Sequence, residues 1–315
     1  MPSDFYRQHV HIDPVALDAF GATLAAGELS APDWRLPVYP DDNNRFVTFA
    51  TIANAINYAF GDLATGDKYI VELDGIPWSG ATAMMAALAR AQREGLDIMN
   101  PYSLEGITVR DAAHIFRPAA GSPPIPLLAQ RAAMLNSVGA TLASGVDIPT
   151  LVDKVAGDAG ALVEEIVGHF AAYADDRWLH PVTKEPLVYD KRARLMAVMY
   201  EGRARASGGH LPRLVNLEAV GPIVDYQLPR VLRAAGVISY SPALAAAVDS
   251  GQLIPAGSVE ELALREATAV TVDALLGAVN SGLAEPITMV ELDFALWSAG
   301  RKAAGRHHLT ATTAY

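Results

Sequence analysis

Hydrophobic residues recur at helical intervals along most of the chain. The spacing is clearest after the start signal "SPPIP" and in the segment that follows it. The apolar positions there are Leu128, Leu135, Val138 and Leu142, and then Leu151, Val155, Leu162, Ile166 and Phe170. A period of three and four residues places these side chains on one face of a helix. The pattern predicts amphipathic helices in both segments and a mainly α fold.

Capping signals mark the ends of several further helices. Ser241 followed by Pro242 is typical of an N-cap and a first helical position, and Gly251 is a stop signal. Three pairs have the spacing of a capping box, in which a hydroxyl side chain and an acidic side chain satisfy each other's backbone N–H groups. These pairs are Thr108 with Asp111, Ser258 with Glu261, and Thr288 with Glu291. We expect a helix to begin at each, the second running to about Val279.

Strand signals are few. "KYIVELDGIPW" has Asp74-Gly75 between apolar runs, which predicts one small β hairpin. "LEAVGPIVDYQLPRVL" predicts a helix, a tight apolar turn at Gly221-Pro222, and a second helix. Residues 117–126 and 175–186 are the best linkers. We expect a single compact enzyme unit over residues 1–315, or two intimate helical halves (about 1–180 and 181–315) with the site between them.

Charge and composition exclude several classes of function. Lys and Arg number 24 against 35 Asp and Glu, a net charge of −11, so long nucleic acid is a poor partner. There are no cysteines, which excludes disulfides and thiolate catalysis and suits a reducing cytosol. No signal peptide and no long apolar segment is present. These features predict a cytoplasmic protein without membrane contact.

The sequence offers no convincing metal or cofactor site. "HVHID" places His9 and His11 near Asp13, but the segment before it is polar, whereas a His-x-His metal site needs a buried strand there. We expect Asp13 to cap a helix that begins at Pro14. The adjacent histidines in "RHHLTATTAY" suit a solvated tail. No phosphate-binding loop, dinucleotide fingerprint or nucleophile elbow is present, so we expect neither a metal nor a cofactor.

Three charged residues stand in apolar surroundings. Asp225, in "GPIVDYQLP", is by local rules a helix N-cap or else a catalytic carboxylate. Asp293, in "MVELDFALW", is a surface position or a group that needs a partner, because apolar residues flank it at helical spacing. Lys191, in "VYDKRARLMAVMYEGRA", belongs to a solvated helix face or to a site. The local sequence leaves these alternatives open.

The order and spacing of several segments resemble the queuosine salvage proteins, which hydrolyse queuosine 5′-monophosphate to release the base queuine. The resemblance runs from about residue 46 to the end. Its segments are "NAINYAF" (54–60), "WSGATAMMAALARAQREGLDI" (78–98), "SLEGITVRDAAHIFR", "IPLLAQRAAMLNSVGATL", "YDKRARLM" (189–196), "VDYQLPRVLRAAGVISYSPAL" and "ELDFALWSAG". The family order Asp-Tyr-Arg-x-Pro-Gln corresponds here to Asp225-Tyr226-Gln227-Leu228-Pro229-Arg230, with the basic side chain three places later.

The resemblance implies a fold similar to the helix-hairpin-helix DNA glycosylases, with a catalytic aspartate at the hairpin and a lysine on an earlier helix. Matched by position, these residues are Asp225 and Lys191. Asp293 is then expected to bind the edge of the base, with aromatic residues stacking on its face. The expected substrate-binding residues are Asn57, Tyr58, Phe60, Tyr226, Arg230, Asp293 and Trp297.

The resemblance further implies a monomeric N-ribohydrolase with a small-molecule substrate and no nucleic-acid partner. Lys191 is expected to contact either the monophosphate or the ribose. Three other functions remain open at this point. They are hydrolysis of another nucleoside monophosphate, non-catalytic nucleotide binding by a helical protein, and base excision from DNA or tRNA, which the acidic charge disfavours.

Overall fold

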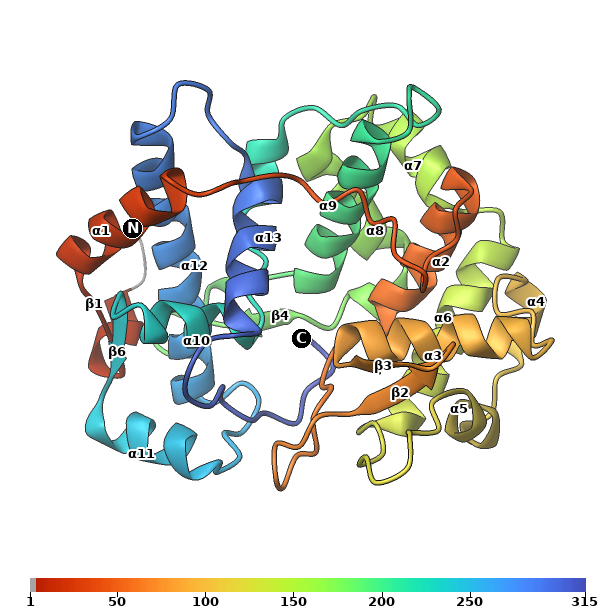
Figure 1. The fold of residues 1–315 in the computed structure, drawn as a ribbon, viewed down its shortest axis with the longest axis horizontal. Coiled ribbons are helices and arrows are strands. Elements are labelled where there is room, and N and C mark those ends of the chain that lie inside the picture. The colour runs from red at the N-terminus through yellow and green to blue at the C-terminus, as the bar shows by residue number, and fades with distance from the viewer. Residues whose placement is uncertain (1–3) are drawn as a thin grey trace. The chain divides into compact units, whose positions relative to one another are not determined.

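The structure is a computed structural model that describes residues 4–315. Thirteen α-helices, three short 3₁₀ helices and three two-stranded antiparallel pairs make up the regular structure of this range (Figure 1). The predicted mainly α fold with a small hairpin is therefore confirmed. None of the helices in the described range is both long and apolar enough to cross a membrane.

The chain divides into two compact units. Unit 1 comprises residues up to Pro32, Arg177–Lys191 and Leu217–Ala311, and unit 2 comprises Asp33–Asp176, Arg192–Asn216 and Thr312–Tyr315. Each unit thus draws on separate parts of the chain. The predicted halves of about 1–180 and 181–315 stay a prediction.

Unit 1 is built around the long helix α12. Its elements are η1 (Asp4–Gln8), β1 (Val10–Ile12), α1 (Pro14–Ala25), β4 (Arg177–Leu179), β5 (Pro186–Val188), η3 (Leu217–Val220), α10 (Gln227–Ala234), β6 (Ile238–Tyr240), α11 (Pro242–Ser250), α12 (Val259–Ser281) and α13 (Met289–Gly300). Helix α1 packs against α12, and α10 packs against α13 (Figure 1). Strand β1 pairs with β6, with Val10 opposite Tyr240, so residues 10–12 are held beside the strand that follows α10.

Unit 2 packs helices around α6. Its elements are α2 (Asn43–Ala55), β2 (Ile70–Leu73), β3 (Ile76–Ser79), α3 (Ala81–Arg93), α4 (Pro101–Glu105), α5 (Val109–Ile115), α6 (Leu128–Ala143), α7 (Ile148–Lys154), α8 (Ala159–His169), η2 (Ala171–Tyr173) and α9 (Lys191–Arg205), whose first residue is counted with unit 1. The predicted hairpin is β2–β3, and Asp74 and Gly75 turn it with φ of 55° and 74°. It packs on α3.

Most of the predicted caps are confirmed. Asp13 accepts hydrogen bonds from the backbone N–H groups of Val15 and Ala16 at the start of α1. Ser241 caps α11, which ends at Gly251 in the left-handed region. Reciprocal capping boxes form at Thr108–Asp111 and Thr288–Glu291.

The predicted capping box at Ser258 forms only in half. The Ser258 hydroxyl accepts from the N–H of Glu261 as expected, but the Glu261 carboxylate accepts from the N–H of Gly257 instead of Ser258. Helix α12 ends at Ser281, close to the predicted Val279.

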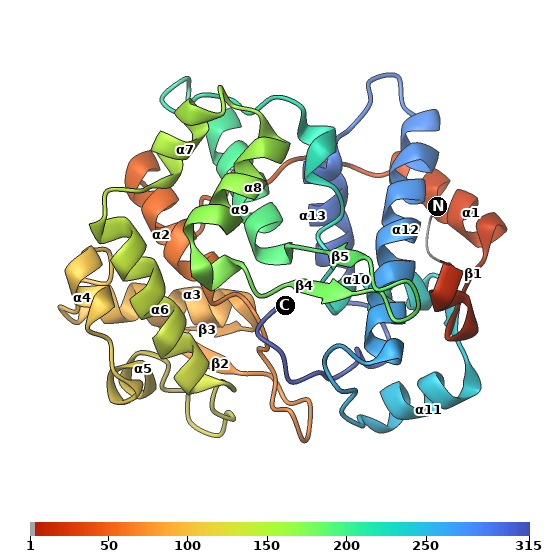
Figure 2. The same cartoon turned by 180° about the vertical axis from the view of Figure 1, so that it is seen from behind.

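Three expectations about local structure are wrong. The helix expected over 151–170 breaks into α7 and α8, because Ala156 and Gly157 adopt φ of 50° and 76° and Asp158 caps a new start by accepting from the N–H of Ala161. Part of the expected linker 175–186 forms the antiparallel pair β4–β5 (Figure 2). The helix expected before Gly221 is only the short 3₁₀ turn η3, too short to be one arm of a helical hairpin.

The expected solvated tail is also a wrong prediction. His308, Thr310 and Thr312 are 3%, 7% and 7% exposed. In unit 1 the N–H of Ile254 donates to the carbonyl of Leu309. The side chains in "LTATTA" are small or medium-sized, so this polar-looking segment can pack closely, and Leu309 forms an isolated bridge with Leu253.

Candidate active site

The turn that leads into α10 holds the Asp225 side chain in place. Gly221 has a φ of 68°, which favours glycine, and the next three residues are buried. Asp225 Oδ1 then accepts hydrogen bonds from the N–H groups of Gln227 (2.7 Å) and Leu228 (3.1 Å). The side chain of Asp225 therefore caps α10, although the N-cap position itself is occupied by the next residue, Tyr226, whose side chain makes no capping hydrogen bond. The predicted capping role is confirmed, and the carboxylate remains partly exposed.

Lys191 lies at the start of α9 and is only 4% exposed. The solvated-face alternative for this residue is therefore wrong. The residue before it, Asp190, has a φ of 42° and forms an ion pair with Arg177 (Oδ2 to Nη2, 2.9 Å). This left-handed residue and its ion pair fix the direction in which the chain enters α9.

Asp225, Asp293 and Lys191 share one electrostatic environment. Burial raises the pKa of Asp225, while Lys191, the N–H groups of Gln227 and Leu228, and Arg265 lower it. Burial and then the charge of Asp225 raise the pKa of Asp293 well above its ordinary value, and Lys191 lowers it. Asp293 is 8% exposed and lies on α13. Neighbouring carboxyl groups with differently shifted pKa values can divide acid and electrostatic roles between them.

Arg265 is a member of this group that sequence reasoning missed. It lies on α12, is 1% exposed, and donates from Nη2 to the carbonyl of Val224 (3.4 Å). Its guanidinium also lies over the Tyr189 ring, 4.0 Å from the centroid. The available signal was Glu261 and Arg265, four residues apart in the apolar run "ELALREATAV", a pattern of a buried ion pair. We call Asp225, Lys191, Asp293 and Arg265 the Asp225 cluster.

The remaining predicted residues of unit 1 lie around α10 and the end of α13. The Tyr226 ring contacts His307, with 4.4 Å between ring centroids. Arg230 donates from Nη2 to the carbonyl of Ala303, so this displaced basic residue is held by the chain that follows α13. Gln227, at the family's arginine position, has a buried Oε1 without a hydrogen-bond partner.

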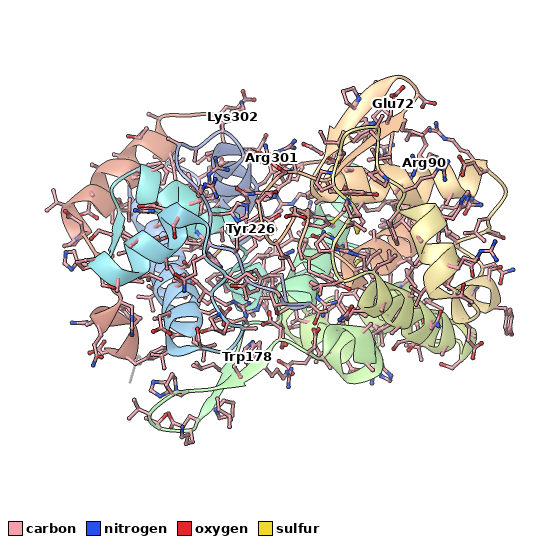
Figure 3. The ribbon with its side chains drawn as sticks, turned by 90° about the horizontal axis from the view of Figure 1, so that it is seen from below. Glu72, Arg90, Trp178, Tyr226, Arg301 and Lys302 are labelled. Atoms are coloured by element: carbon pink, nitrogen blue, oxygen red, sulfur yellow. The ribbon has the colours of Figure 1, made fainter. Side chains whose placement is uncertain are left out.

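Trp297 lies one helical turn beyond Asp293 on α13. Its ring stacks with Phe294 (6.2 Å between centroids), and the Arg301 guanidinium lies 5.0 Å from the Trp297 ring. Figure 3 labels Tyr226, beside the start of α10, and Arg301, beyond the end of α13. These two helices pack together, so aromatic and cationic groups gather on the elements that carry Asp225 and Asp293.

Asn57, Tyr58 and Phe60 belong to unit 2, where they are 4%, 0% and 6% exposed. The Arg131 guanidinium lies 4.3 Å from the Tyr58 ring centroid and 5.6 Å from that of Phe60. Arg192 covers Tyr58 as well, at 5.6 Å. Burial raises the pKa of Tyr58 to about 12, and its buried Oη has no hydrogen-bond partner. Both buried arginines were missed from the sequence.

Arg131 supports this segment through the backbone. It donates to the carbonyl oxygens of Ile56, Tyr58 and Ala59 from the first turn of α6. Five donors in a rigid plane let one arginine satisfy several carbonyls of an irregular segment. Residues 56–59 are thereby held in one conformation.

No cluster of three or more His, Asp or Glu side chains able to hold a metal ion is found within residues 4–315. His9 comes directly before β1, His11 is the middle residue of that strand, and Asp13 is engaged in capping α1. The donor set of a His-x-His metal site is thus not assembled around them.

Comparisons with known proteins identify the family. The family described as queuosine salvage protein matches residues 38–315. A Sphaerobacter thermophilus protein named queuosine 5′-phosphate N-glycosylase/hydrolase is 29% identical over 300 residues, which cover 94% of this chain and 88% of that protein. Proteins of the same name from Nematostella vectensis and Mus musculus are 26% and 25% identical, covering 82% and 80% of this chain and 78% and 75% of their own. The chain belongs to the queuosine salvage protein family.

Proposed function

We propose that this protein is an N-ribohydrolase that cleaves the N-glycosidic bond of queuosine 5′-monophosphate and releases queuine. The names of its relatives support this activity. The observation that carries the proposal is the Asp225 cluster, in which a partly exposed aspartate lies within electrostatic reach of a buried lysine and a second carboxyl group. This is a group of titratable side chains with perturbed pKa values of the kind that marks catalytic sites.

Asp225 is proposed as the catalytic carboxylate. Cleavage of the bond leaves a ribosyl cation that resembles an oxocarbenium ion, and a fixed negative charge near C1′ stabilises it. The two N–H groups that bind Oδ1 of Asp225 hold the carboxylate in position and favour its charged form. The other oxygen is left to orient or deprotonate the attacking water.

Asp293 is proposed to bind the base in its protonated form. Queuine is a 7-deazaguanine, so it offers carbon where purines accept a proton at N7, and activation of this leaving group must use other atoms. A protonated carboxyl donates one hydrogen bond and still accepts others. The raised pKa of Asp293 suits this role, in which it accepts from an N–H group of the base and donates to an acceptor as the base gains negative charge.

Lys191 is proposed to bind the monophosphate or the ribose. Its ammonium group is a compact charge within the electrostatic reach of both carboxylates, so it also lowers the pKa of Asp225 and favours its charged form. Tyr226, Arg230 and Trp297 are proposed to line the substrate from α10 and α13. Asn57, Tyr58 and Phe60 keep their predicted substrate-binding role as a proposal.

One experiment tests the activity. Purified protein, treated with a chelator, is incubated separately with queuosine 5′-monophosphate, queuosine and guanosine 5′-monophosphate, and the released base is measured by chromatography. We expect queuine from the first substrate at a higher rate than from the second, and no guanine from the third. Release of guanine at a similar rate would replace queuosine with a broader class of nucleotide. No base from any substrate would refute the hydrolase.

A further inference from the structure

We propose that Arg265 is a positioning residue that fixes the Asp225 carboxylate relative to Lys191 by holding the two chain segments that precede them. This inference rests on the proposed function, because it assigns Arg265 to the geometry of the proposed catalytic pair. Neither the family name nor the relatives' names say anything of this residue.

Arg265 reaches both segments from α12. Its Nη2 donates to the carbonyl of Val224, the residue directly before Asp225. Its guanidinium plane lies over the ring of Tyr189, two residues before Lys191, at 4.0 Å from the centroid. A planar guanidinium can stack on a ring and donate at its edge at the same time, which an ammonium cannot do. One side chain thus contacts both strands of chain that carry the charged pair.

Buried neighbours hold Arg265 and its two contact partners in place. Tyr189, Val224 and Leu262 form a small buried cluster of their own, separate from the main core of unit 1. Arg265 is 1% exposed, so water does not compete for its donors. Tyr189 is further held by its hydroxyl, which donates to Glu266 Oε2 (3.2 Å) on α12. Helix α12 therefore acts as the rigid support for both segments.

The charges around the carboxylate agree with this geometry. Asp225 faces Lys191 from the start of α9, Arg265 from α12 and Asp293 from α13, besides the N–H groups of α10. Arg265 itself faces Glu261, with 3.9 Å between Nε and Oε1, and lowers the pKa of His308 from the C-terminal segment. Removing the Arg265 charge is therefore expected to raise the pKa of Asp225.

Three variants separate the charge of Arg265 from its geometry. Arg265→Gln removes both, Arg265→Lys keeps the charge without the plane, and Tyr189→Leu keeps the arginine but removes the ring under it. The matched control is Arg233→Gln, which removes an arginine of α10 that pairs with Asp249 and lies over Tyr240, outside the Asp225 cluster. Each protein is checked for cooperative unfolding above the assay temperature before its activity is measured.

The activity readout is kcat and KM for queuosine 5′-monophosphate across the pH range. We expect Arg265→Gln to lower kcat by about 10- to 100-fold, as misplacement of a reacting group does, and to move the acid limb of the profile to higher pH. Arg265→Lys and Tyr189→Leu are expected to lower kcat while the acid limb stays in place. Arg233→Gln is expected to match the wild type.

The outcomes decide between positioning and mere packing. A loss of kcat in Arg265→Lys and Tyr189→Leu without a shift of the acid limb supports positioning when both variants unfold cooperatively above the assay temperature, because a fully folded variant does not lose rate through a smaller active fraction. Wild-type kcat in Arg265→Lys and in Tyr189→Leu would overturn it. If Arg265→Gln does not fold, these two variants still decide the point.

A second readout is independent of activity. The carboxyl ¹³C resonance of Asp225, assigned by its loss in Asp225→Asn, is titrated in wild type and in the Arg265 variants. A raised pKa in Arg265→Gln, restored in Arg265→Lys, supports the contact between these groups, whereas identical titrations would overturn it. If wild type releases no base, the proposed hydrolase fails, while this titration still reports on Arg265.

Discussion

Asp225 has two roles that substitution can separate, because its cap uses an oxygen and its proposed chemistry uses a charge. Asparagine keeps an Oδ1 acceptor for the N–H groups of Gln227 and Leu228, and it caps helices about as well as aspartate. We therefore expect Asp225→Asn to change the free energy of unfolding by no more than about 0.5 kcal/mol. Asp225→Ala loses both hydrogen bonds and should cost about 1 kcal/mol.

The rate should respond differently. Loss of a transition-state electrostatic stabiliser lowers kcat by on the order of 10³-fold, which corresponds to about 4 kcal/mol in the activation free energy. Both variants should lose this amount, since neither has the charge. Removing the charge of Asp225 also removes one cause of the raised pKa of Asp293, which should therefore fall in both.

The assay combines three measurements on wild type, Asp225→Asn and Asp225→Ala. They are single-turnover release of queuine, substrate affinity by calorimetry, and denaturant unfolding. Affinity should be retained within about tenfold in Asp225→Asn, because the cap keeps the turn in place. Wild-type turnover in Asp225→Asn would refute the catalytic role and leave Asp225 as a cap only. A large loss of stability in Asp225→Asn would refute the separation of the two roles.

Three further predictions concern neighbouring positions. Lys191→Ala should lose more activity with the monophosphate than with the nucleoside if Lys191 binds phosphate, and equal losses measured by chromatography would assign it to the ribose. The pKa of Asp293 is raised in the folded state, so its ionisation costs stability as pH rises from about 4 through that pKa. The melting temperature of Asp293→Asn should therefore fall less with pH over this window than that of the wild type. An equal fall in both proteins would contradict the raised pKa. A Cβ at Gly300 would lie 3.0 Å from the carbonyl oxygen of Gln227, so Gly300→Ala should disturb the start of α10 and lower kcat. The control is Gly277→Ala on the open surface of α12, where an added Cβ meets no other atom. It should stabilise α12 by up to about 1 kcal/mol in thermal unfolding without changing kcat.

Local signals in the sequence were enough to predict most helix boundaries. The caps at Asp13, Ser241 and Thr288 are short-range interactions within three residues, so spacing alone indicates them. The prediction of one helix over 151–170 was wrong because it also relied on local spacing alone. The apolar period continued through Val155, but the left-handed backbone at Ala156 and Gly157 interrupted it.

Buried charges were predicted less well, because their partners are distant in the chain. Asp225 and Lys191 were found through family resemblance, and local rules alone left each of them ambiguous. Arg265 was missed because its contacts with Val224 and Tyr189 join segments that periodicity does not connect. The burial of His308 was missed since a polar terminal segment gives no local sign of the surface that covers it.

The pairing of β1 with β6 has a consequence for how the protein folds. Val10 can pair with Tyr240, and α1 can pack on α12, only once these later segments have been made. The core of unit 1 therefore forms only after nearly the whole chain has been synthesised. Contacts between residues so far apart in the chain form slowly, because the intervening chain must be closed first. Residues 33–176 of unit 2 are by contrast contiguous and can fold as they emerge. We therefore expect Asp225 and Lys191 to come together only in the last phase of folding, so refolding kinetics followed at this cluster should be slower than those of residues 33–176.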